Sequence, residues 1–291
     1  MDTISAEESK ISIVMPAYNE EQSISKTVSE IKKLYPDFEI LVIDDGSTDN
    51  TYQAAVAAGA HVMKHPHNIG NGAAIKTGMR YASGDWIIMM DADGQHKPAD
   101  IAKLLQYKDT YDMVVGARSK DSTTALHRDL GNFIYNRLAT YITKFKVEDL
   151  TSGFRLVRNE RVKKFIYLLP NTFSYPSTIT MAYLRSGLSI KYVSIKTEAR
   201  KGKSKIKLLQ DGTRFLLIIT RIATLFSPFR IFLPVSFTFF VTGLCYYLYT
   251  YVTQHRFTNM SALLISSAII IFMMGLVSEQ VSQMRYDRVE D

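Results

Sequence analysis

Two long runs without a charged residue lie near the C-terminus, and they constrain the fold more than any other feature. Residues 231–252 and 257–278 are each 22 residues long and contain no Asp, Glu, Lys or Arg. A helix needs about 20 apolar residues to span the hydrocarbon core of a bilayer, and the few residues between the runs suffice only for a tight turn. We therefore predict a transmembrane helical hairpin; two buried helices of a soluble core are the alternative.

The charges around these runs indicate an orientation. Arg230 precedes the first run, Arg285 and Arg288 follow the second, and the turn between them carries Arg256. Because Lys and Arg accumulate on the cytoplasmic side of membrane helices, we expect both termini in the cytoplasm. The polar and acidic start of the chain does not resemble a secretory signal. We therefore expect the part before the hairpin on the cytoplasmic face as well.

The segment before the hairpin, residues 206–226, is apolar but carries Lys207, Asp211, Arg214 and Arg221. Their spacings of four, three and seven place these charges on one helical face. This pattern predicts an interfacial helix lying along the membrane surface. A third spanning helix is the alternative, and it would place two arginines in hydrocarbon. The expected organisation is a catalytic domain over residues 1–205, an interfacial segment over 206–228, and a hairpin with a short tail over 229–291.

The first half of the chain alternates short β-branched runs with helical patterns. Such alternation indicates an α/β fold, with a mostly parallel sheet and helices on both faces. In these sheets, ligands bind beyond the carboxyl ends of the strands. The expected strands are residues 11–15, 39–43, 60–64, 86–90, 113–117 and 190–195. The expected helices begin near residue 19 and at 51, 72, 101 and 129.

An acidic segment follows the expected strand 86–90. Asp91 and Asp93 are two positions apart, so on extended backbone their side chains point to the same side and can share one cation. Gln95 adds a carbonyl oxygen at the next position on that side. Oxygen ligands of this kind suit Mg²⁺ or Mn²⁺, with water and a diphosphate filling the remaining positions. The alternative is a solvated turn without a metal.

Two further polar segments follow neighbouring strands. Asp44 and Asp45 end the second strand, where carboxylates can accept hydrogen bonds from a base or from ribose hydroxyls; the residues after them can also cap the next helix. Pro16, Tyr18 and Glu20 follow the first strand. Tyr18 can flank a nucleobase and Glu20 can bind a ribose or base edge. In the alternative interpretation, Asn19 caps the next helix and the glutamates favour its positive end.

These motifs together resemble those of a known family. Residues 16–21, 44–49, 91–96 and 151–155 occur in the order and spacing of family 2 glycosyltransferases of GT-A fold, and they are most similar to the dolichol-phosphate mannose synthase branch. The resemblance covers roughly residues 11–205. It implies that Pro16, Tyr18, Glu20, Asp45 and Asp91 contact the nucleotide, with Asp44 as a further candidate. It also implies that Asp91, Asp93 and Gln95 bind the metal, with Asp93 catalytic.

Basic residues indicate where phosphates bind. Arg118 ends a strand at the same edge of the sheet, and Arg128 opens a helix. The resemblance places the basic loop of residues 200–205 near phosphates, where it would bind the acceptor phosphate or the donor diphosphate. The alternative is that this loop is attracted to anionic lipid. Asn132 stands where the family pattern has a serine. The candidate phosphate-binding residues are Arg118, Arg128, Asn132, Arg155, Arg200, Ser204 and Lys205, of which Arg118 and Arg128 are also candidate catalytic residues.

The net charge of +7 suits a phosphate-bearing partner. Binding to nucleic acid would explain this charge but not the hairpin, so we expect no nucleic-acid partner. A phosphate monoester has a second pKa of about 6 and is already a nucleophile at neutral pH. We therefore expect an inverting, metal-dependent transfer of a hexose from a UDP- or GDP-linked sugar to a dolichyl or undecaprenyl phosphate.

Two other functions use the same early motifs. Processive polysaccharide synthases of this family carry a Gln-x-x-Arg-Trp motif and more membrane helices, whereas the single tryptophan here, Trp86, lies in an expected strand. A non-catalytic membrane adaptor of the same fold would be expected to have lost metal ligands, and none is lost. The sequence leaves the sugar, the nucleotide, the length of the lipid, the ion and a homo-oligomeric state open.

Overall fold

The computed structural model describes residues 9–119, 136–137, 139–141, 143–172, 174–197 and 226–290, the last six by their backbone alone. Five candidate site residues lie outside this part of the chain: Arg128, Asn132, Arg200, Ser204 and Lys205. The predicted interfacial helix also lies outside it, apart from its last residue. The chain divides into two compact units, Met1–Ile206 and Lys207–Asp291, which are described separately.

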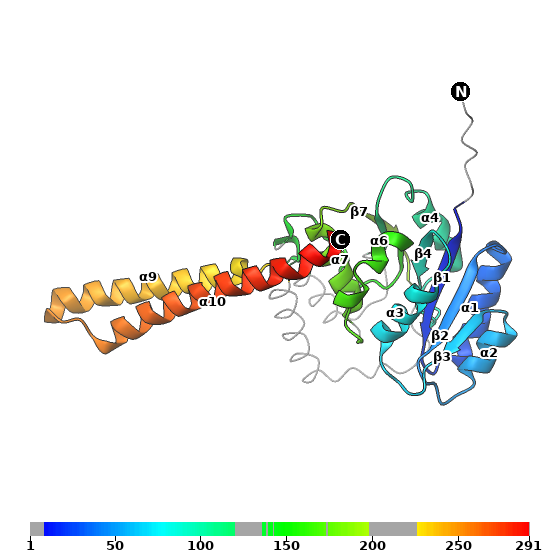
Figure 1. Cartoon of the computed structure of the whole chain (residues 1–291), viewed down its shortest axis with the longest axis horizontal. Coiled ribbons are helices and arrows are strands. Elements are labelled where there is room, and N and C mark those ends of the chain that lie inside the picture. The colour runs from blue at the N-terminus through cyan, green and yellow to red at the C-terminus, as the bar shows by residue number, and fades with distance from the viewer. Residues whose placement is uncertain are drawn as a thin grey trace, which may run out of the picture. The chain divides into compact units, whose positions relative to one another are not determined.

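The first unit is built on a seven-stranded mixed sheet (Figure 1). Its strands are β1 (Ile11–Ala17), β2 (Glu39–Asp44), β3 (His61–Lys64), β4 (Trp86–Met89), β5 (Met113–Arg118), β6 (Arg155–Arg158) and β7 (Ile190–Ile195). Their order across the sheet is β3-β2-β1-β4-β6-β5-β7. Strand β6 is antiparallel to both of its neighbours, and the other pairs are parallel. The predicted α/β class with a mostly parallel sheet is confirmed.

Helices cover both faces of this sheet. In α1 (Glu21–Leu34), Ile24, Val28 and Ile31 follow the helical period and are buried in the cluster that contains one face of β1. On the other face, Gly78 of α3 (Asn71–Tyr81) packs directly on Val14. The remaining elements are α2 (Thr51–Ala57), η1 (Pro98–Asp100), α4 (Ile101–Leu105), α6 (Asn159–Lys163), η2 (Ile166–Leu168) and α7 (Tyr175–Arg185). The described residues between 136 and 143 are also helical, as expected.

Five elements of this unit were not predicted: the short elements η1, α6 and η2, the strand β6 and the helix α7. Strand β6 has only four residues and an arginine at each end, so it lacks the β-branched run that marked the other strands. Helix α7 is buried at every position from Tyr175 to Tyr183, including Ser and Thr residues. A helix buried on all sides has no amphipathic period, and this removes the pattern on which a prediction depends.

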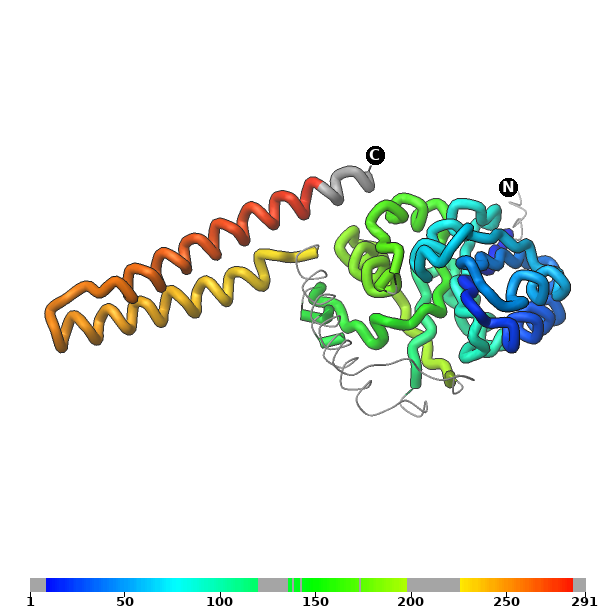
Figure 2. The backbone as a smooth tube through the Cα atoms, turned by 90° about the horizontal axis from the view of Figure 1, so that it is seen from below, coloured from blue at the N-terminus to red at the C-terminus, as the bar shows by residue number. Residues whose placement is uncertain are grey.

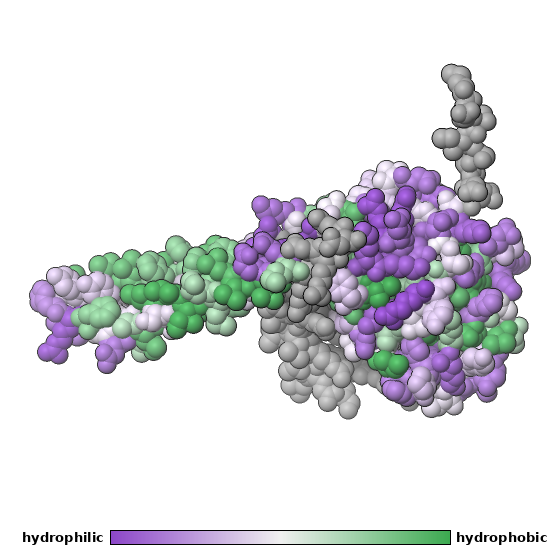
Figure 3. Space-filling view, viewed as in Figure 1, coloured by the Kyte–Doolittle hydropathy of each residue, from purple (hydrophilic) through white to green (hydrophobic). Residues whose placement is uncertain are grey.

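The described part of the second unit, residues 226–290, contains two antiparallel helices, α9 (Phe229–Gln254) and α10 (Asn259–Glu290) (Figure 2). Both are long and apolar enough to cross a membrane, and only 11% and 17% of their most apolar windows are buried within the chain. Apolar side chains cover most of their visible surface (Figure 3). The Ser236 hydroxyl donates to the Ala268 carbonyl at 2.7 Å and ties the helices together. The predicted hairpin is therefore present, and its exposed apolar surface differs from that of soluble core helices.

Candidate active site

A pocket of about 450 Å³ lies at the carboxyl ends of β1, β2 and β4. In the sheet, β1 lies between β2 and β4, so the strand order reverses at this point. Open α/β sheets bind their ligands at such a switch point. Six predicted residues line it: Pro16, Tyr18, Glu20, Asp45, Asp91 and Asp93. The other lining residues are Ala17, Asn68, Ile69, Gly70, Asn71, Ala92 and Thr172.

The pocket wall that carries Tyr18 is fixed by hydrogen bonds between the loop after β1 and the loop after β2. Asn19 has a φ of 55°, and its backbone N–H donates to the Ser47 hydroxyl at 3.0 Å. The Asn19 side chain accepts from the backbone N–H of Thr48 at 2.9 Å. It therefore does not cap α1, whose N-cap residue is Glu20, and the capping interpretation of Asn19 is wrong. The Tyr18 ring remains exposed at the pocket.

The two adjacent aspartates of β2 differ in role. Asp44 is fully buried and does not line the pocket, so the prediction that it contacts a nucleotide is wrong in this structure. Successive side chains of a strand point to opposite faces, and Asp44 points into the protein. One of its oxygens accepts from the backbone N–H of Ser47 at 2.9 Å, and the other lies 3.6 Å from Nζ of Lys64.

Asp45 lines the pocket and also holds the loop of residues 68–71 by two hydrogen bonds. Its Oδ1 accepts from the backbone N–H of Ile69 at 3.0 Å, and its Oδ2 accepts from that of Gly70 at 2.7 Å. This loop contributes lining residues that sequence reasoning missed. The sequence does contain a pattern that could have indicated this loop, a polar run with glycine between β3 and α3. Gly70 has a φ of 123°, which favours glycine, and the positions of Gly70 and Gly72 leave no room for a Cβ beside the carbonyls of residues 170–172.

The opposite wall carries Asp91 and Asp93 on the turn after β4. Asp93 accepts from the backbone N–H of Gln95 at 3.1 Å, and the Ser23 hydroxyl ties the turn to α1 through the Ala92 carbonyl at 2.8 Å. Gln95 does not line the pocket. Among the described residues, no three of His, Cys, Asp and Glu gather closely enough to hold a metal by themselves. The two carboxylates fit a hard cation that takes its other ligands from water and phosphate.

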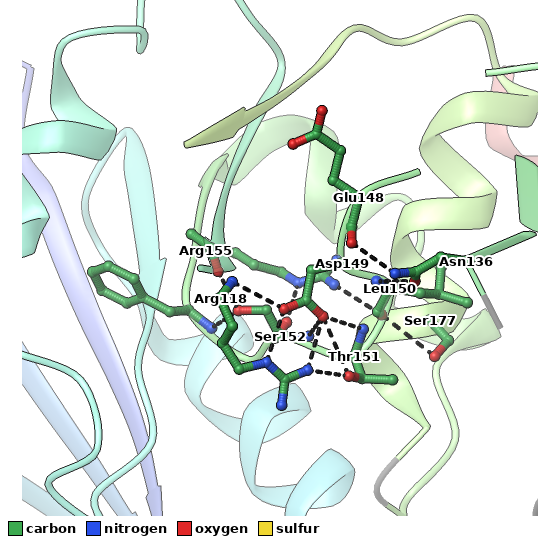
Figure 4. Close-up of polar contacts among 11 residues, drawn as sticks. Arg118, Asn136, Glu148, Asp149, Leu150, Thr151, Ser152, Arg155 and Ser177 are labelled. Atoms are coloured by element: carbon green, nitrogen blue, oxygen red, sulfur yellow. Dashed lines mark hydrogen bonds and ion pairs between the residues drawn. The ribbon is translucent and has the colours of Figure 1, made fainter. Parts of the chain in front are cut away.

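Arg118 is the last residue of β5, and its side chain is held by the Asp149 carboxylate. Its Nε donates to Oδ2 of Asp149 and its Nη2 to Oδ1, both at 2.8 Å, and Nη2 also donates to the Thr151 hydroxyl (Figure 4). Burial opposes ionisation of Asp149, but the hydrogen bonds and charge of Arg118 outweigh it and hold the pKa of Asp149 below its usual value. About a fifth of the Arg118 side chain remains exposed. Its contact with a phosphate stays a prediction.

Arg155 is fully buried, so the prediction that it binds a phosphate is wrong in this structure. Its Nε donates to the Ser152 carbonyl at 2.7 Å and its Nη2 to the Leu150 carbonyl at 3.2 Å (Figure 4). Its Nη1 donates to the Thr180 hydroxyl at 2.6 Å. These carbonyls belong to the turn that also carries Asp149. Arg155 therefore acts inside the protein, where it fixes the turn that holds Arg118.

Comparison with protein families identifies both units. Residues 12–165, more than half of the chain, match the model of glycosyl transferase family 2. Residues 227–284 match the model described as the GtrB C-terminal hairpin. These two matches fall on the sheet-containing unit and on the helical hairpin.

Two curated relatives have names that describe an activity. Glycosyltransferase AglJ of Haloferax volcanii is 27% identical over 298 residues, covering 96% of each chain. The undecaprenyl-phosphate 4-deoxy-4-formamido-L-arabinose transferase of Photorhabdus laumondii is 30% identical over 184 residues, covering 57% of each chain. The first relative thus matches the chain along nearly its whole length, and the second over little more than half.

A solved structure of similar fold is glucosyl-3-phosphoglycerate synthase of Mycobacterium tuberculosis in complex with Mn²⁺, UDP-glucose and phosphoglyceric acid. Its TM-score is 0.61 at 22% sequence identity, over 74% of this chain and 79% of that one. At this identity the likeness shows the fold alone, which is GT-A.

Proposed function

The chain belongs to glycosyl transferase family 2, and from this premise we propose that it transfers a hexose from a nucleotide-sugar to a polyprenyl phosphate. A dolichyl or undecaprenyl phosphate is the acceptor, and a UDP- or GDP-linked sugar is the donor. The observation that carries the proposal is the pair Asp91 and Asp93 at a pocket of about 450 Å³, in a chain that ends in an apolar hairpin. Relatives named for transfer to undecaprenyl phosphate support the acceptor class.

The donor occupies the pocket between its two walls. Tyr18 and Glu20 contact the nucleoside, and Asp45 keeps the loop of residues 68–71 in the shape that receives it. Asp91 and Asp93 would hold Mg²⁺ or Mn²⁺, with the Gln95 carbonyl as a further candidate ligand from outside the pocket lining. A cation bound there would neutralise negative charge on the leaving nucleoside diphosphate.

The acceptor needs positioning more than activation. A phosphate monoester with a second pKa of about 6 carries a nucleophilic oxygen at neutral pH, so no general base is required. Arg118 lies at the carboxyl end of β5 and orients the incoming phosphate, together with Arg128, Asn132 and three residues of the basic loop, Arg200, Ser204 and Lys205. Attack from the face opposite the leaving group inverts the anomeric centre.

The membrane gives the reaction its location. We place the catalytic domain over residues 1–205, an interfacial segment over 206–228 and the hairpin over 229–291, with both termini in the cytoplasm. The hairpin keeps the enzyme at the surface where the phosphate of a polyprenyl lipid is exposed. Two helices with apolar spans of 26 residues each, Phe229–Gln254 and Asn259–Met284, support this assignment.

The test is transfer of label into lipid. The full-length protein in detergent is incubated with undecaprenyl or dolichyl phosphate, Mn²⁺ and a panel of radiolabelled UDP- and GDP-sugars. We expect one donor to label the organic extract, and mild acid to release the sugar from it. Label found only in polymer would favour a polysaccharide synthase, and no label in either phase with any donor would favour a non-catalytic adaptor.

A further inference from the structure

The hydroxyl group of Tyr175 is buried without a hydrogen-bond partner among the residues that the structure describes. Tyr175 is the first residue of α7 and is only 2% exposed. A buried hydroxyl that lacks a partner destabilises the protein, and native proteins keep few of them. Such a group is therefore a candidate for a bond that forms only in a state with ligand bound.

The Tyr175 hydroxyl faces the same small space as the Asp91 carboxylate. A Cβ placed on Gly153 would lie 2.7 Å from Oδ2 of Asp91 and 3.2 Å from the Tyr175 hydroxyl oxygen. Because residue 153 is glycine, this space stays open and no side chain separates the two oxygens. Gly153 thus brings the carboxylate on the pocket wall close to a hydroxyl of the protein interior.

The chemistry of Tyr175 suits it to donate a hydrogen bond. A tyrosine hydroxyl has an ordinary pKa of about 10 and keeps its proton throughout the neutral range. A protonated hydroxyl beside an anionic carboxylate can donate a charge-assisted hydrogen bond to it.

We propose that Tyr175 is a positioning residue that donates a hydrogen bond to Asp91 when this carboxylate binds the divalent cation. The proposal rests on the metal site of the proposed function. A carboxylate that binds a metal through one oxygen is commonly hydrogen-bonded through the other, and this second bond fixes its orientation. Oδ2 of Asp91 is the oxygen that faces Gly153, so it is the one on the side of Tyr175.

The proposal predicts that Tyr175→Phe raises the Tm of the metal-free protein but lowers its affinity for Mn²⁺. In metal-free protein, Tyr175→Phe removes an unpaired buried hydroxyl, and we expect the Tm to rise by roughly 2–4 °C. In the loaded protein the same substitution removes the hydrogen bond to Asp91. We expect the affinity for Mn²⁺ to fall about 10-fold, the lower end of what loss of such a partner costs.

Tyr183 provides a matched control on the same helix. It is fully buried and its hydroxyl also lacks a partner within the described residues, but it does not adjoin Asp91. Tyr183→Phe should raise the Tm of the metal-free protein in the same way and leave Mn²⁺ affinity unchanged. A lower Mn²⁺ affinity in Tyr175→Phe than in Tyr183→Phe would therefore report a role of Tyr175 at the metal site.

The experiment titrates the full-length protein in detergent with Mn²⁺, in the presence of UDP and in parallel of GDP. Free Mn²⁺ is quantified by its electron paramagnetic resonance signal, and the Tm is followed with and without EDTA. Weakened Mn²⁺ binding in Tyr175→Phe alone supports the proposal. Equal affinity in Tyr175→Phe and the unmodified protein, or equal weakening in Tyr183→Phe, would overturn it.

The same titration separates this proposal from the proposed function. If the unmodified protein binds no Mn²⁺ with either nucleotide, the metal site fails and the role of Tyr175 fails with it. If Tyr175→Phe alone loses affinity while no lipid is labelled, the role of Tyr175 stands and the acceptor assignment is wrong.

Discussion

His65 and Asp45 form a hydrogen-bonded pair behind the pocket wall: Nδ1 of the imidazole lies 2.7 Å from Oδ1 of the carboxylate. The other ring nitrogen lies 3.0 Å from the Thr77 hydroxyl on α3. The Asp45 carboxylate also accepts from the backbone of Ile69 and Gly70. The pair therefore connects β2, the loop of residues 68–71 and α3, and it gives this loop a fixed shape before a nucleotide arrives.

Removing the imidazole should weaken donor binding. We expect His65→Ala to raise the KM for the nucleotide-sugar about 10-fold, equivalent to ~1.4 kcal/mol, with kcat little changed, because the loop loses its support while the carboxylates near the diphosphate remain. His65→Asn keeps an N–H near Nδ1 and should recover most of the affinity. Steady-state kinetics with each substrate varied in turn measure both quantities.

His67 is the control for this prediction. It lies two residues after His65, directly before the loop of residues 68–71, but it is exposed, so His67→Ala should behave as the unmodified protein. A loss of kcat with unchanged KM in His65→Ala would show that the pair serves the chemical step and would contradict the prediction.

Asp93 should be indispensable for turnover. Asp93→Asn replaces one of the two carboxylates that we propose to bind the cation by a neutral amide, and the cation then loses half of its charged protein ligands. We expect kcat to fall by at least ~100-fold, a loss typical of removing charge stabilisation at a reacting centre, while the Tm without metal is unchanged. Asp109→Asn, at an exposed surface aspartate, is the control. Near-normal transfer by Asp93→Asn at saturating Mn²⁺ would refute the assignment.

The pair of Asp149 and Arg118 should make the protein sensitive to acid. The folded-state pKa of Asp149 is lowered, so its contribution to stability is present above about pH 4 and is lost as the pH falls through the folded pKa. Asp149→Asn should reduce the free energy of unfolding by roughly 2–4 kcal/mol at neutral pH. This deficit should shrink below pH 4, where the unmodified protein loses the same charge.

Thermal denaturation of both proteins between pH 7 and pH 3 measures this difference. Because other carboxylates titrate in the same range, the quantity of interest is the gap between the two curves and not either curve alone. A gap that stays constant over this range would mean that Asp149 owes its stabilising effect to packing and not to its charge.

Arg155 should affect folding and not substrate affinity. Arg155→Lys leaves the Ser152 and Leu150 carbonyls and the Thr180 hydroxyl without their common donor, and we expect a loss of about 3 kcal/mol of stability. The exposed Arg158 at the other end of β6 is the control, since Arg158→Lys should cost little. If Arg155→Lys kept its Tm and raised only the KM for the lipid acceptor, Arg155 would contact phosphate after all.

Much of the pocket could be predicted because it depends on short-range patterns. The strands β1, β2 and β4 are mainly apolar, and the polar residues after them must meet at one edge of a parallel sheet. This places Tyr18, Glu20, Asp45, Asp91 and Asp93 at one pocket. The chemical types of these residues then indicate a nucleotide and a cation.

Other features depend on tertiary contacts that a single sequence does not display. Asp44 and Asp45 have the same chemistry, and only the strand end decides which of them reaches the pocket. Arg155 looks like a phosphate ligand until its burial is known, because a guanidinium fork suits carbonyl oxygens as well as phosphate. The loop of residues 68–71 is placed by its contact with residues 170–172, about a hundred positions further along the chain.

The antiparallel strand β6 has a consequence for how such an enzyme can diversify. Arg155, its first residue, pairs with Met89 at the end of β4 and with Val115 near the end of β5. The chain thus leaves the sheet after β5 and re-enters it at the same edge, the one that holds the carboxylates. An insertion within this excursion, away from the turn of Asp149 and Gly153, would leave the register of the sheet strands unchanged. We therefore expect changes of acceptor preference to arise there while the proposed donor pocket is kept.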